Sequence, residues 1–562
     1  MASTGAKVRL GAGALMLQGV QHVLANSTGW IILTAILQQT GAPGAVIEQA
    51  IRVGLIIVGV GVLLQSRRGG GFGSGHFCPP ICGPVYASAS VMAGHLYGLP
   101  VLFGMTVFAG IVEMGVATLV PRLRAVFPAE VVGSVMVMVG VSLIPFAMTR
   151  LIGAPDSTVG APLVPASYSF VGLATLMAMV GVTVWARGRL RFYPTLIGLT
   201  VGGAAAAWTG NGIGSGWKEI MAQPWIDWPI HSLQALSFEP SLVLPFALAG
   251  LAGALKAVGD MALCQRADDP LHWQRVDLRN AGRGAMAQGM TTMLAGLLGA
   301  PGQNTASVNV GLAITIGFRE RVLALVMGPM MIALAFLPKV ASVIAHLPGP
   351  IMGGILTLAA SSIMTAGLQI LSSRLLDARR VVIVGLSLAF GISAAFMPQL
   401  YAGVPGLFRP AFVSGVALTT MVAVALNFLL RLGTTQRRVL TLSGAQQEPP
   451  AVEAAVADFA ASVGARRDIT GHATEAVCHC LDALGAQEVT LRLSFSEDQL
   501  RVDIEHDGPP IPLRTTPPDP KALLDEADGA LQMTGFLVGR RADRVEATVR
   551  SGRSHLVLEF DH

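Results

Sequence analysis

Residues 242–263 read LVLPFALAGLAGALKAVGDMAL, an apolar run that contains one lysine, Lys256, and one aspartate, Asp260. A helix needs about 20 apolar residues to cross the hydrocarbon core of a bilayer, so this run predicts a membrane-spanning helix. An ionisable side chain at that depth costs free energy and is by default a candidate functional residue. Lys256 and Asp260 are one helical turn apart and are therefore expected on the same face of the helix.

Similar apolar runs recur along the chain up to about residue 432. The 562-residue chain is 52% hydrophobic and only 13% charged, whereas a soluble domain carries roughly 25% charged residues. We predict an all-α polytopic membrane domain over residues 1–432, a linker over 433–450 and a soluble α+β domain over 451–562. The fourteen candidate spans centre near residues 20, 57, 88, 108, 138, 177, 200, 252, 292, 312, 331, 360, 388 and 420.

The net charge of +5 does not indicate nucleic-acid binding, because Lys and Arg gather in alternate loops between the spans. That alternation follows the positive-inside rule and predicts an even number of crossings with both termini in the cytoplasm. The chain begins without a cleavable signal peptide and runs directly into the first span. We therefore expect a multi-pass protein of a bacterial-type inner membrane.

Two of the spans are interrupted by proline and glycine. They are residues 76–86, HFCPPICGPVY, and residues 300–309, APGQNTASVN. They fall third in the first seven spans and third in the second seven, and matching broken segments in two halves indicate a transporter binding site. Non-helical backbone at membrane depth survives where it is buried in protein or lines a cavity. The N-termini of the half-helices that follow favour an anionic or acceptor-rich ligand.

Several motifs, in order and spacing over roughly residues 8–435, resemble the nucleobase–ascorbate transporter family of the uracil and xanthine permease type. They are Gln18-Gly-Val-Gln-His-Val-Leu-Ala25, Gly61-Val-Leu-Leu-Gln65, Gly259-Asp260, Asn309-Val-Gly311 with Gly317 and Arg321, and Leu347-Pro-Gly-Pro-Ile-Met-Gly-Gly354. The resemblance implies two inverted seven-span repeats, divided into core and gate domains. It also implies a homodimer that works by alternating access, with substrate held between spans three, eight and ten.

The resemblance places the substrate beside five residues: Tyr86, Lys256, Ser307, Val308 and Asn309. Two of them depart from the family pattern. Lys256 stands where the family has a glutamate that accepts hydrogen bonds from the ring N–H groups of a base, and Val308 stands at a Gln/Glu/Pro position. The motif threonine falls on Ile316, with Thr315 beside it.

A charged lysine donates three hydrogen bonds and accepts none, so it suits carbonyl or carboxylate oxygens. One interpretation is therefore an oxo-rich or anionic substrate: an oxidised purine such as urate, an orotate-like acid, or a small organic anion outside the nucleobases. The other is that Lys256 pairs with Asp260 and neutralises it, while backbone groups recognise the substrate. Asp260, His22 and Glu113 are the candidates for ion coupling or relay, with H⁺ or Na⁺ as the coupling ion.

The tail resembles the ATP-binding fold of histidine kinases and anti-sigma-factor kinases, the GHKL type. It shows a helix near 468–484, strands near 489–495 and 500–505, a helix near 529–541 and strands near 544–549 and 554–560. The asparagine box of that fold reads Glu475-Ala-Val-Cys-His479, and the aspartate box reads His506-Asp-Gly-Pro-Pro510. Both boxes have lost ligands, although a shift of register would return Asp507 to the adenine-binding role. We expect a regulatory or dimerising module that does not hydrolyse ATP.

The leading hypothesis is a secondary transporter with a small-molecule substrate, no cofactor, no metal and no enzymatic activity. A membrane sensor that reports substrate through the tail is the alternative from another class. An ATP-driven pump is disfavoured because the chain lacks a Gly-x4-Gly-Lys-Ser/Thr loop.

Overall fold

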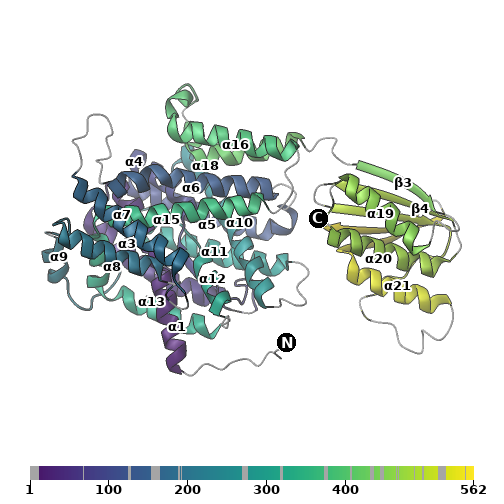
Figure 1. Ribbon diagram of the computed structural model, residues 1–562, viewed down its shortest axis with the longest axis horizontal. Helices are drawn as coiled ribbons and strands as arrows, with labels where there is room; N and C mark the ends of the chain where they lie inside the picture. Colours follow the sequence, from purple (N-terminus) through teal and green to yellow (C-terminus); the bar gives the residue numbers. More distant parts are fainter. Residues whose placement is uncertain are drawn as a thin grey trace. The chain divides into compact units, whose positions relative to one another are not determined.

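The chain forms two compact units in a computed structural model, Met1–Asn427 and Phe428–His562 (Figure 1). The structure describes residues 12–67, 69–123, 128–152, 165–187, 190, 193–214, 216–268, 276–316, 321–372, 378–405, 408–430, 436–442, 448–463, 465, 467–485, 488–496, 499–514, 516, 527–550 and 552–561. The predicted domain boundary at Leu432 lies outside these residues.

The first unit is built almost entirely of helices. They are α1 (Ala12–Ala25), α2 (Ser27–Gln39), α3 (Gly44–Gln65), α4 (Ala87–Tyr97), α5 (Leu99–Leu123), α6 (Ala129–Ile152), α7 (Ala166–Trp185), α8 (Pro194–Trp208), α9 (Gly216–Ala222), α10 (Val243–Asp268), α11 (Leu278–Leu298), α12 (Ser307–Ile316), α13 (Val322–Ala335), α14 (Pro338–Ala345), α15 (Gly349–Leu371), α16 (Ala378–Phe396), α17 (Arg409–Val413) and α18 (Gly415–Leu430). All fourteen predicted span centres fall within one of these helices.

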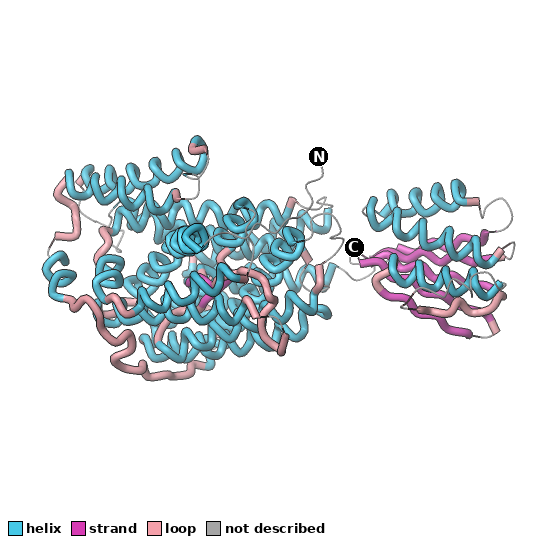
Figure 2. The backbone as a smooth tube through the Cα atoms, turned by 90° about the horizontal axis from the view of Figure 1, so that it is seen from below, coloured by secondary structure: helices cyan, strands magenta, loops and turns pink. Residues whose placement is uncertain are grey.

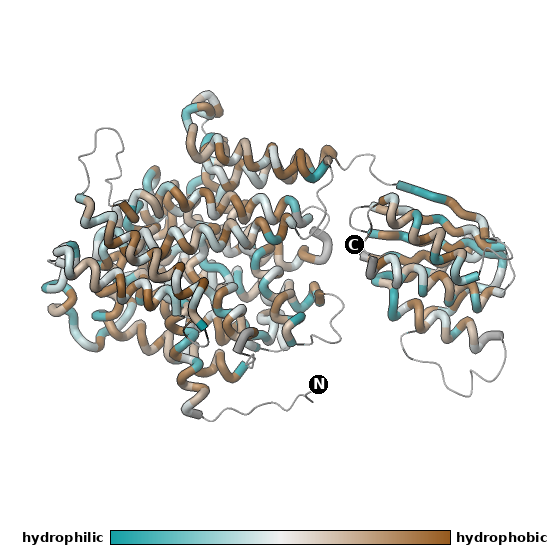
Figure 3. Tube along the Cα trace, in the orientation of Figure 1, coloured by the Kyte–Doolittle hydropathy of each residue, from teal (hydrophilic) through white to brown (hydrophobic). Residues whose placement is uncertain are grey.

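Within the described part of the chain, eight helices are long and apolar enough to cross a membrane, or nine if the bent pair α13–α14 forms one span. Two shorter apolar helices, α8 and α18, accompany them. Helix α16 is largely hydrophobic along its length (Figure 3). Large apolar side chains are exposed on α7 and α16, including Phe170, Met177, Val382 and Phe390. Apolar side chains on the outside of a helical unit are what a lipid solvent requires. The unit is therefore a multi-pass membrane protein.

Glycine lets the long helices approach one another closely. A Cβ at Gly133 of α6 would lie 3.0 Å from the carbonyl oxygen of Gly367 in α15, and one at Gly110 of α5 would lie 2.8 Å from that of Gly289 in α11. Figure 1 shows α6 and α15 running side by side. Small residues at such contacts are the usual means by which helices pack in a membrane, where no hydrophobic driving force acts between them.

The two broken segments meet. Strand β1 (Pro80–Cys82) pairs antiparallel with β2 (Gln303–Thr305), so that Pro80 lies opposite Thr305. Figure 2 shows this short two-stranded sheet among the helices of the first unit. Beyond β1 the chain forms the 3₁₀ helix η1 (Pro84–Tyr86) and α4, and beyond β2 it enters α12. The predicted half-helices are confirmed, but their joining by a strand pair is not visible in the sequence.

The second unit is a five-stranded antiparallel sheet with strand order β3-β4-β5-β7-β6. Its elements are β3 (Gln436–Leu442), α19 (Pro449–Val463), α20 (Arg467–Leu484), β4 (Val489–Ser496), β5 (Gln499–His506), α21 (Ala527–Arg541), β6 (Arg544–Arg550) and β7 (Arg553–Asp561). Alternate strand residues such as Leu491, Val502 and Leu558 form one core with Val456 of α19 and Val477 of α20. The other sheet face carries charged side chains.

One prediction about the tail is wrong. Residues 433–450 were expected to be a linker, yet β3 lies within them and pairs with β4 along its whole length, from Gln436↔Phe495 to Leu442↔Val489. Helix α19 also begins inside that range, at Pro449. The strand escaped prediction because its first half is polar and exposed, as an edge strand can be, and only Leu442 is buried.

Candidate functional site

The ammonium group of Lys256 lies in a cage of oxygen atoms. It donates to Asp260 Oδ2 at 3.0 Å, to the backbone oxygen of Thr305 at 2.5 Å and to Ser307 Oγ at 2.9 Å, with Thr305 Oγ1 at 3.4 Å. These three near contacts satisfy the three N–H donors of a lysine. The side chain is 12% exposed. The predicted pairing of Lys256 with Asp260 is present, and Thr305 and Ser307 of the second broken segment complete the cage.

Asp260 joins the cage together. Its Oδ2 accepts from Lys256, from Thr305 Oγ1 and from Ser307 Oγ. The two hydroxyls thus accept from the ammonium and donate to the carboxylate. A buried charge pair gains stability only when such hydrogen bonds satisfy its remaining polar atoms. The cage is accordingly a hydrogen-bonded network of an ammonium group, a carboxylate, a carbonyl and two hydroxyls.

Three elements hold this geometry. Helix α10 carries Lys256 and Asp260, β2 carries Thr305, and Ser307 opens α12. Thr305 is fixed by its strand pairing to Pro80 and by its own N–H, which donates to Asn304 Oδ1 at 2.7 Å. Pro301 cannot donate a backbone hydrogen bond and interrupts helical structure before β2. Removing the break would turn the Thr305 carbonyl into an intrahelical acceptor and take it away from Lys256.

The first turn of α12 has one open face. Ser307, Val308 and Gly311 are exposed on it, and Val308 is 66% exposed. Asn309 faces the other way: it is buried and its Nδ2 donates to the backbone oxygen of His22 at 3.1 Å. Of the three residues predicted to meet substrate here, the structure therefore places Ser307 and Val308 on the open face and Asn309 in a helix contact.

Tyr86 and Glu113 form a second polar cluster, fully buried. Tyr86 Oη and Thr292 Oγ1 each donate to Glu113 Oε2 at 2.9 Å. Glu113 comes from α5, Thr292 from α11 and Tyr86 from the end of η1. The side chain of Tyr86 is thus occupied with a predicted relay residue, and any contact of this residue with substrate would have to use its backbone.

His22 is buried beneath the broken segment. Its ring meets Phe77 edge-on, with centroids 4.8 Å apart, and neither ring nitrogen has a hydrogen-bond partner among the residues described. Its backbone holds Asn309, as noted above. The structure therefore ties His22 to α12 through the backbone, while its imidazole forms no hydrogen bond with the described residues of the Lys256 cage.

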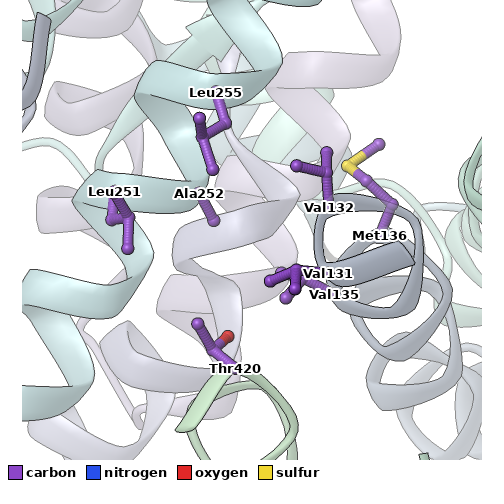
Figure 4. Close-up of a pocket in the computed structure, with 8 residues that line it drawn as sticks. All are labelled: Val131, Val132, Val135, Met136, Leu251, Ala252, Leu255 and Thr420. Atoms are coloured by element: carbon purple, nitrogen blue, oxygen red, sulfur yellow. The ribbon is translucent and has the colours of Figure 1, made fainter. Parts of the chain in front are cut away.

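A narrow apolar cavity of about 10 Å³ adjoins the cage on α10 (Figure 4). Leu255 is next to Lys256 in the chain, and Ala252 lies one turn before it. They face α6 and Thr420 of α18. The full lining is Val131, Val132, Val135, Met136, Leu251, Ala252, Leu255 and Thr420. The cavity has room for about one water molecule, so its apolar wall mainly packs α10 against α6 and α18.

Sequence reasoning missed Thr305 and Thr292. Each donates to the carboxylate of a candidate residue, Asp260 or Glu113. The available signal for Thr305 was its place at the end of the break, immediately before a helix. Thr292 carries no such signal, since its importance comes from packing of α11 on α5. Among the described residues, no group of three or more His, Cys, Asp or Glu side chains is placed to hold a metal ion.

In the second unit, Asp507 and Glu475, which belong to the two boxes noted in the sequence, are held in ion pairs. Arg553 Nε donates to Asp507 Oδ1 at 2.7 Å and its Nη2 donates to Oδ2 at 3.2 Å. These bonds hold the pKa of Asp507 below its ordinary value. Glu475 accepts from Arg541 at 3.1 Å. Cys480 is buried, which raises the pKa of its thiol to about 12.

The first unit is similar to known transporters in sequence and in fold. It is 26% identical over 426 residues to the uric acid permease PucK of Bacillus subtilis, covering 74% of this chain and 94% of the relative. It is 25% identical over 429 residues to the xanthine permease XanP of Escherichia coli, covering 73% and 90%. The fold is similar to that of the murine Solute Carrier 26 family member A9 anion transporter in the inward-facing state, with a TM-score of 0.53, 13% identity and coverage of 78% and 71%.

Residues 13–400 match the family Xan_ur_permease, described as a permease family, which spans the whole region that holds the Lys256 cage and both broken segments. The resemblance noted in the sequence is thereby confirmed for the membrane unit. Its relatives are permeases and not enzymes. The chain belongs to the Xan_ur_permease family of membrane transporters.

Proposed function

We propose that this protein is an ion-coupled secondary transporter of a purine- or pyrimidine-type, oxo-rich and anionic substrate. Membership of the permease family supports transport, and the names of the uric acid and xanthine permeases support the ring class. The observation that carries the anionic, oxo-rich part is Lys256. It places an ammonium donor where α10 meets the open first turn of α12.

In this proposal the protein recognises oxygen atoms of the substrate through hydrogen-bond donors. A substrate oxygen takes the place of Ser307 Oγ or Thr305 O on the ammonium, while the ring lies toward the apolar side of α10. The N–H groups of Ser307 and Val308 come before the first intrahelical acceptor of α12 and add donors on the same face, whereas those of Asn309 and Val310 donate to the backbone oxygen of Ala306. Positive helix ends aimed at anionic groups are a recurrent device of transporters with broken helices. Asp260 Oδ2, with three donors already, is poorly suited to a ring N–H.

We further propose the family architecture for the membrane unit: fourteen spans in two inverted seven-span repeats, core and gate domains, and a homodimer with both termini in the cytoplasm of a bacterial cell. The fourteen helix-centred segments and the antiparallel pairing of β1 with β2 support it. Alternating access would then expose the Lys256 region to each side in turn. Asp260, Glu113 and His22 are the proposed ion-coupling or relay groups, with H⁺ or Na⁺ as the ion.

The tail is proposed to be a regulatory module of GHKL-like ancestry without ATPase activity. Its α+β order and the ion pairing of Asp507 with Arg553 support this reading. To bind Asp507, an adenine amino group would have to displace Arg553, which donates two hydrogen bonds to that carboxylate. The proposal is tested by measuring the binding and hydrolysis of radioactive ATP by the purified chain. A rate of ATP hydrolysis above that of the double variant Glu475→Gln, Asp507→Asn would contradict it.

Uptake into proteoliposomes tests the transport proposal. Wild-type protein is expected to take up urate or xanthine in competition with other oxidised purines, and Lys256→Glu is expected to lose at least tenfold in uptake. Uptake of dicarboxylates alone would instead make the substrate an organic anion outside the nucleobases. No uptake of any candidate, combined with substrate-dependent changes in the tail, would replace transport by sensing. Lys218→Ala, an exposed lysine of α9, is the matched control.

A further inference from the structure

The contacts of Lys256 have the composition of a metal-cation site. The cage offers a carboxylate, a backbone carbonyl and two hydroxyls, all oxygen, supplied by α10, β2 and α12. Oxygen ligands of these kinds bind hard cations in proteins. Backbone carbonyls released by a broken helix are also the groups that bind Na⁺ in transporters with discontinuous helices. Here the charge at the centre of the cage is the ammonium group of the chain itself.

The arrangement around Asp260 requires a cation. Its side chain is 7% exposed, and its Oδ2 accepts from two hydroxyls as well as from the ammonium. Hydroxyl groups lessen but do not cancel the cost of a buried carboxylate, so removal of the ammonium leaves an uncompensated charge. The hydroxyls of Thr305 and Ser307 can serve a cation in the same position, since each has lone pairs directed at Lys256 Nζ.

We infer that Lys256 is a tethered cation: its ammonium fills an oxygen cage that would otherwise take Na⁺, and so makes this site independent of sodium. The inference rests on the proposed transport function, and it narrows the choice of coupling ion by removing Na⁺ from this position. A covalently attached cation cannot be exchanged between the two sides of the membrane. The coupling ion, given above as H⁺ or Na⁺, is then H⁺.

The test removes the ammonium group and most of the lysine side chain. Lys256→Ala leaves the carboxylate, the carbonyl and both hydroxyls in place. The melting temperature of this variant in detergent is expected to rise by a few degrees as NaCl replaces choline chloride at constant ionic strength, because a ligand that binds only the folded state stabilises it. The wild type is expected to melt at the same temperature in both salts.

Three variants separate this result from a general salt effect. Lys256→Met fills the same volume without a charge and is expected to show no sodium response. Lys256→Ala combined with Asp260→Asn loses the carboxylate and is expected to lose the response as well. Lys218→Ala, on the exposed face of α9, controls for loss of any lysine. Equal sodium responses in Lys256→Ala and Lys256→Met would overturn the inference.

A second measurement does not depend on the variants folding. Wild-type uptake is expected to be the same in sodium and in choline buffers, and sodium-dependent melting or a tenfold sodium dependence of uptake would overturn the tethered-cation account. The effect of sodium on the melting temperature is measured in the absence of substrate. Failure of every tested purine to be transported would therefore count against the proposed function, while the melting data would still decide the inference.

Discussion

At the scale of the residue, the central feature is a lysine and an aspartate that are paired and largely buried on one membrane helix. Lys256 is satisfied by one carboxylate, one carbonyl and one hydroxyl, and Asp260 is satisfied in return. The sequence predicted the pair from its spacing on one helix. It could not predict Thr305, because that partner comes from a segment far along the chain that is brought near only by the β1–β2 pairing.

Removing one partner of the Lys256–Asp260 pair is expected to lower the free energy of unfolding. Lys256→Met leaves Asp260 buried without its cation, and the loss of one partner of a buried pair costs about 3–5 kcal/mol. The melting temperature in detergent is the measurement. Replacing both partners, Lys256→Met with Asp260→Leu, should recover part of that loss because no charge is then left unpaired. A double variant as unstable as the sum of the two single ones would show that the pair is not coupled.

At the scale of the element, the two broken segments were predicted from proline and glycine in matching places, and each forms the expected short approach to a helix. What the sequence could not supply was their contact. A three-residue strand pair has no periodic signal of its own, since it is stabilised by its surroundings. The contact of the Tyr86 backbone with substrate stays a prediction, and packing directs the hydroxyl of this residue to Glu113.

Gly302 tests the fit between these segments. A Cβ there would lie 2.5 Å from Cγ of Tyr86 and 2.6 Å from its Cδ2, so Gly302→Ala must displace the ring. Such overpacking costs about 1–3 kcal/mol, and loss of the Tyr86–Glu113 bond adds to it. Gly385→Ala in α16, where a Cβ meets nothing within 4 Å, is the control and should not lower the melting temperature. Equal melting of both variants would contradict the tight packing.

The charged face of the tail sheet predicts acid sensitivity. Burial opposes ionisation of Glu505, yet hydrogen bonds from Arg492 and Arg553 keep its pKa below the ordinary value, and Arg553 does the same for Asp507. A carboxyl whose folded pKa is depressed stabilises the fold above its unfolded pKa of about 4, and that stability is lost as the pH falls through the folded pKa.

The melting temperature of the fragment 428–562, followed by circular dichroism, is expected to fall below about pH 4. Arg553→Ala should flatten that fall, because its two carboxyl partners no longer prefer the charged form in the folded state. Arg544→Ala, whose side chain is 76% exposed and 3.9 Å from Glu559, is the control and should melt with the wild-type profile. A fall in melting temperature of equal size in Arg553→Ala and Arg544→Ala would contradict the role given to Arg553.

At the scale of the whole molecule, two units with separate cores share one chain. Hydropathy located fourteen of the helices described in the first unit, because lipid imposes long apolar runs on spans, but it gave no separate centre to α2, α9, α14 or α17. The number of crossings is harder to predict, since α11 and α12 are polar or short and depend on their neighbours. The tail boundary was misplaced because edge strand β3 is mostly polar.

The position of β3 makes truncation informative. Ending the chain after Leu432 keeps the first unit and removes the whole sheet, and the shortened protein is expected to fold and to retain uptake. Ending it after residue 450 leaves β3 without its partner β4 and exposes a strand edge, so this longer protein should aggregate more on size-exclusion chromatography. Loss of uptake in both would mean that the membrane unit needs the tail.

The central claim is that Lys256 selects an oxo-rich anion of the nucleobase class. The most direct measurement is the affinity of purified protein for urate, xanthine and uracil, by thermal shift, in wild type, Lys256→Gln and Lys256→Glu. We expect urate to stabilise the wild type more than xanthine or uracil does. Its affinity is expected to fall at least tenfold in both variants, and further in Lys256→Glu than in Lys256→Gln. Binding of neutral bases alone, unchanged in Lys256→Gln, would show that the lysine serves only as the partner of Asp260.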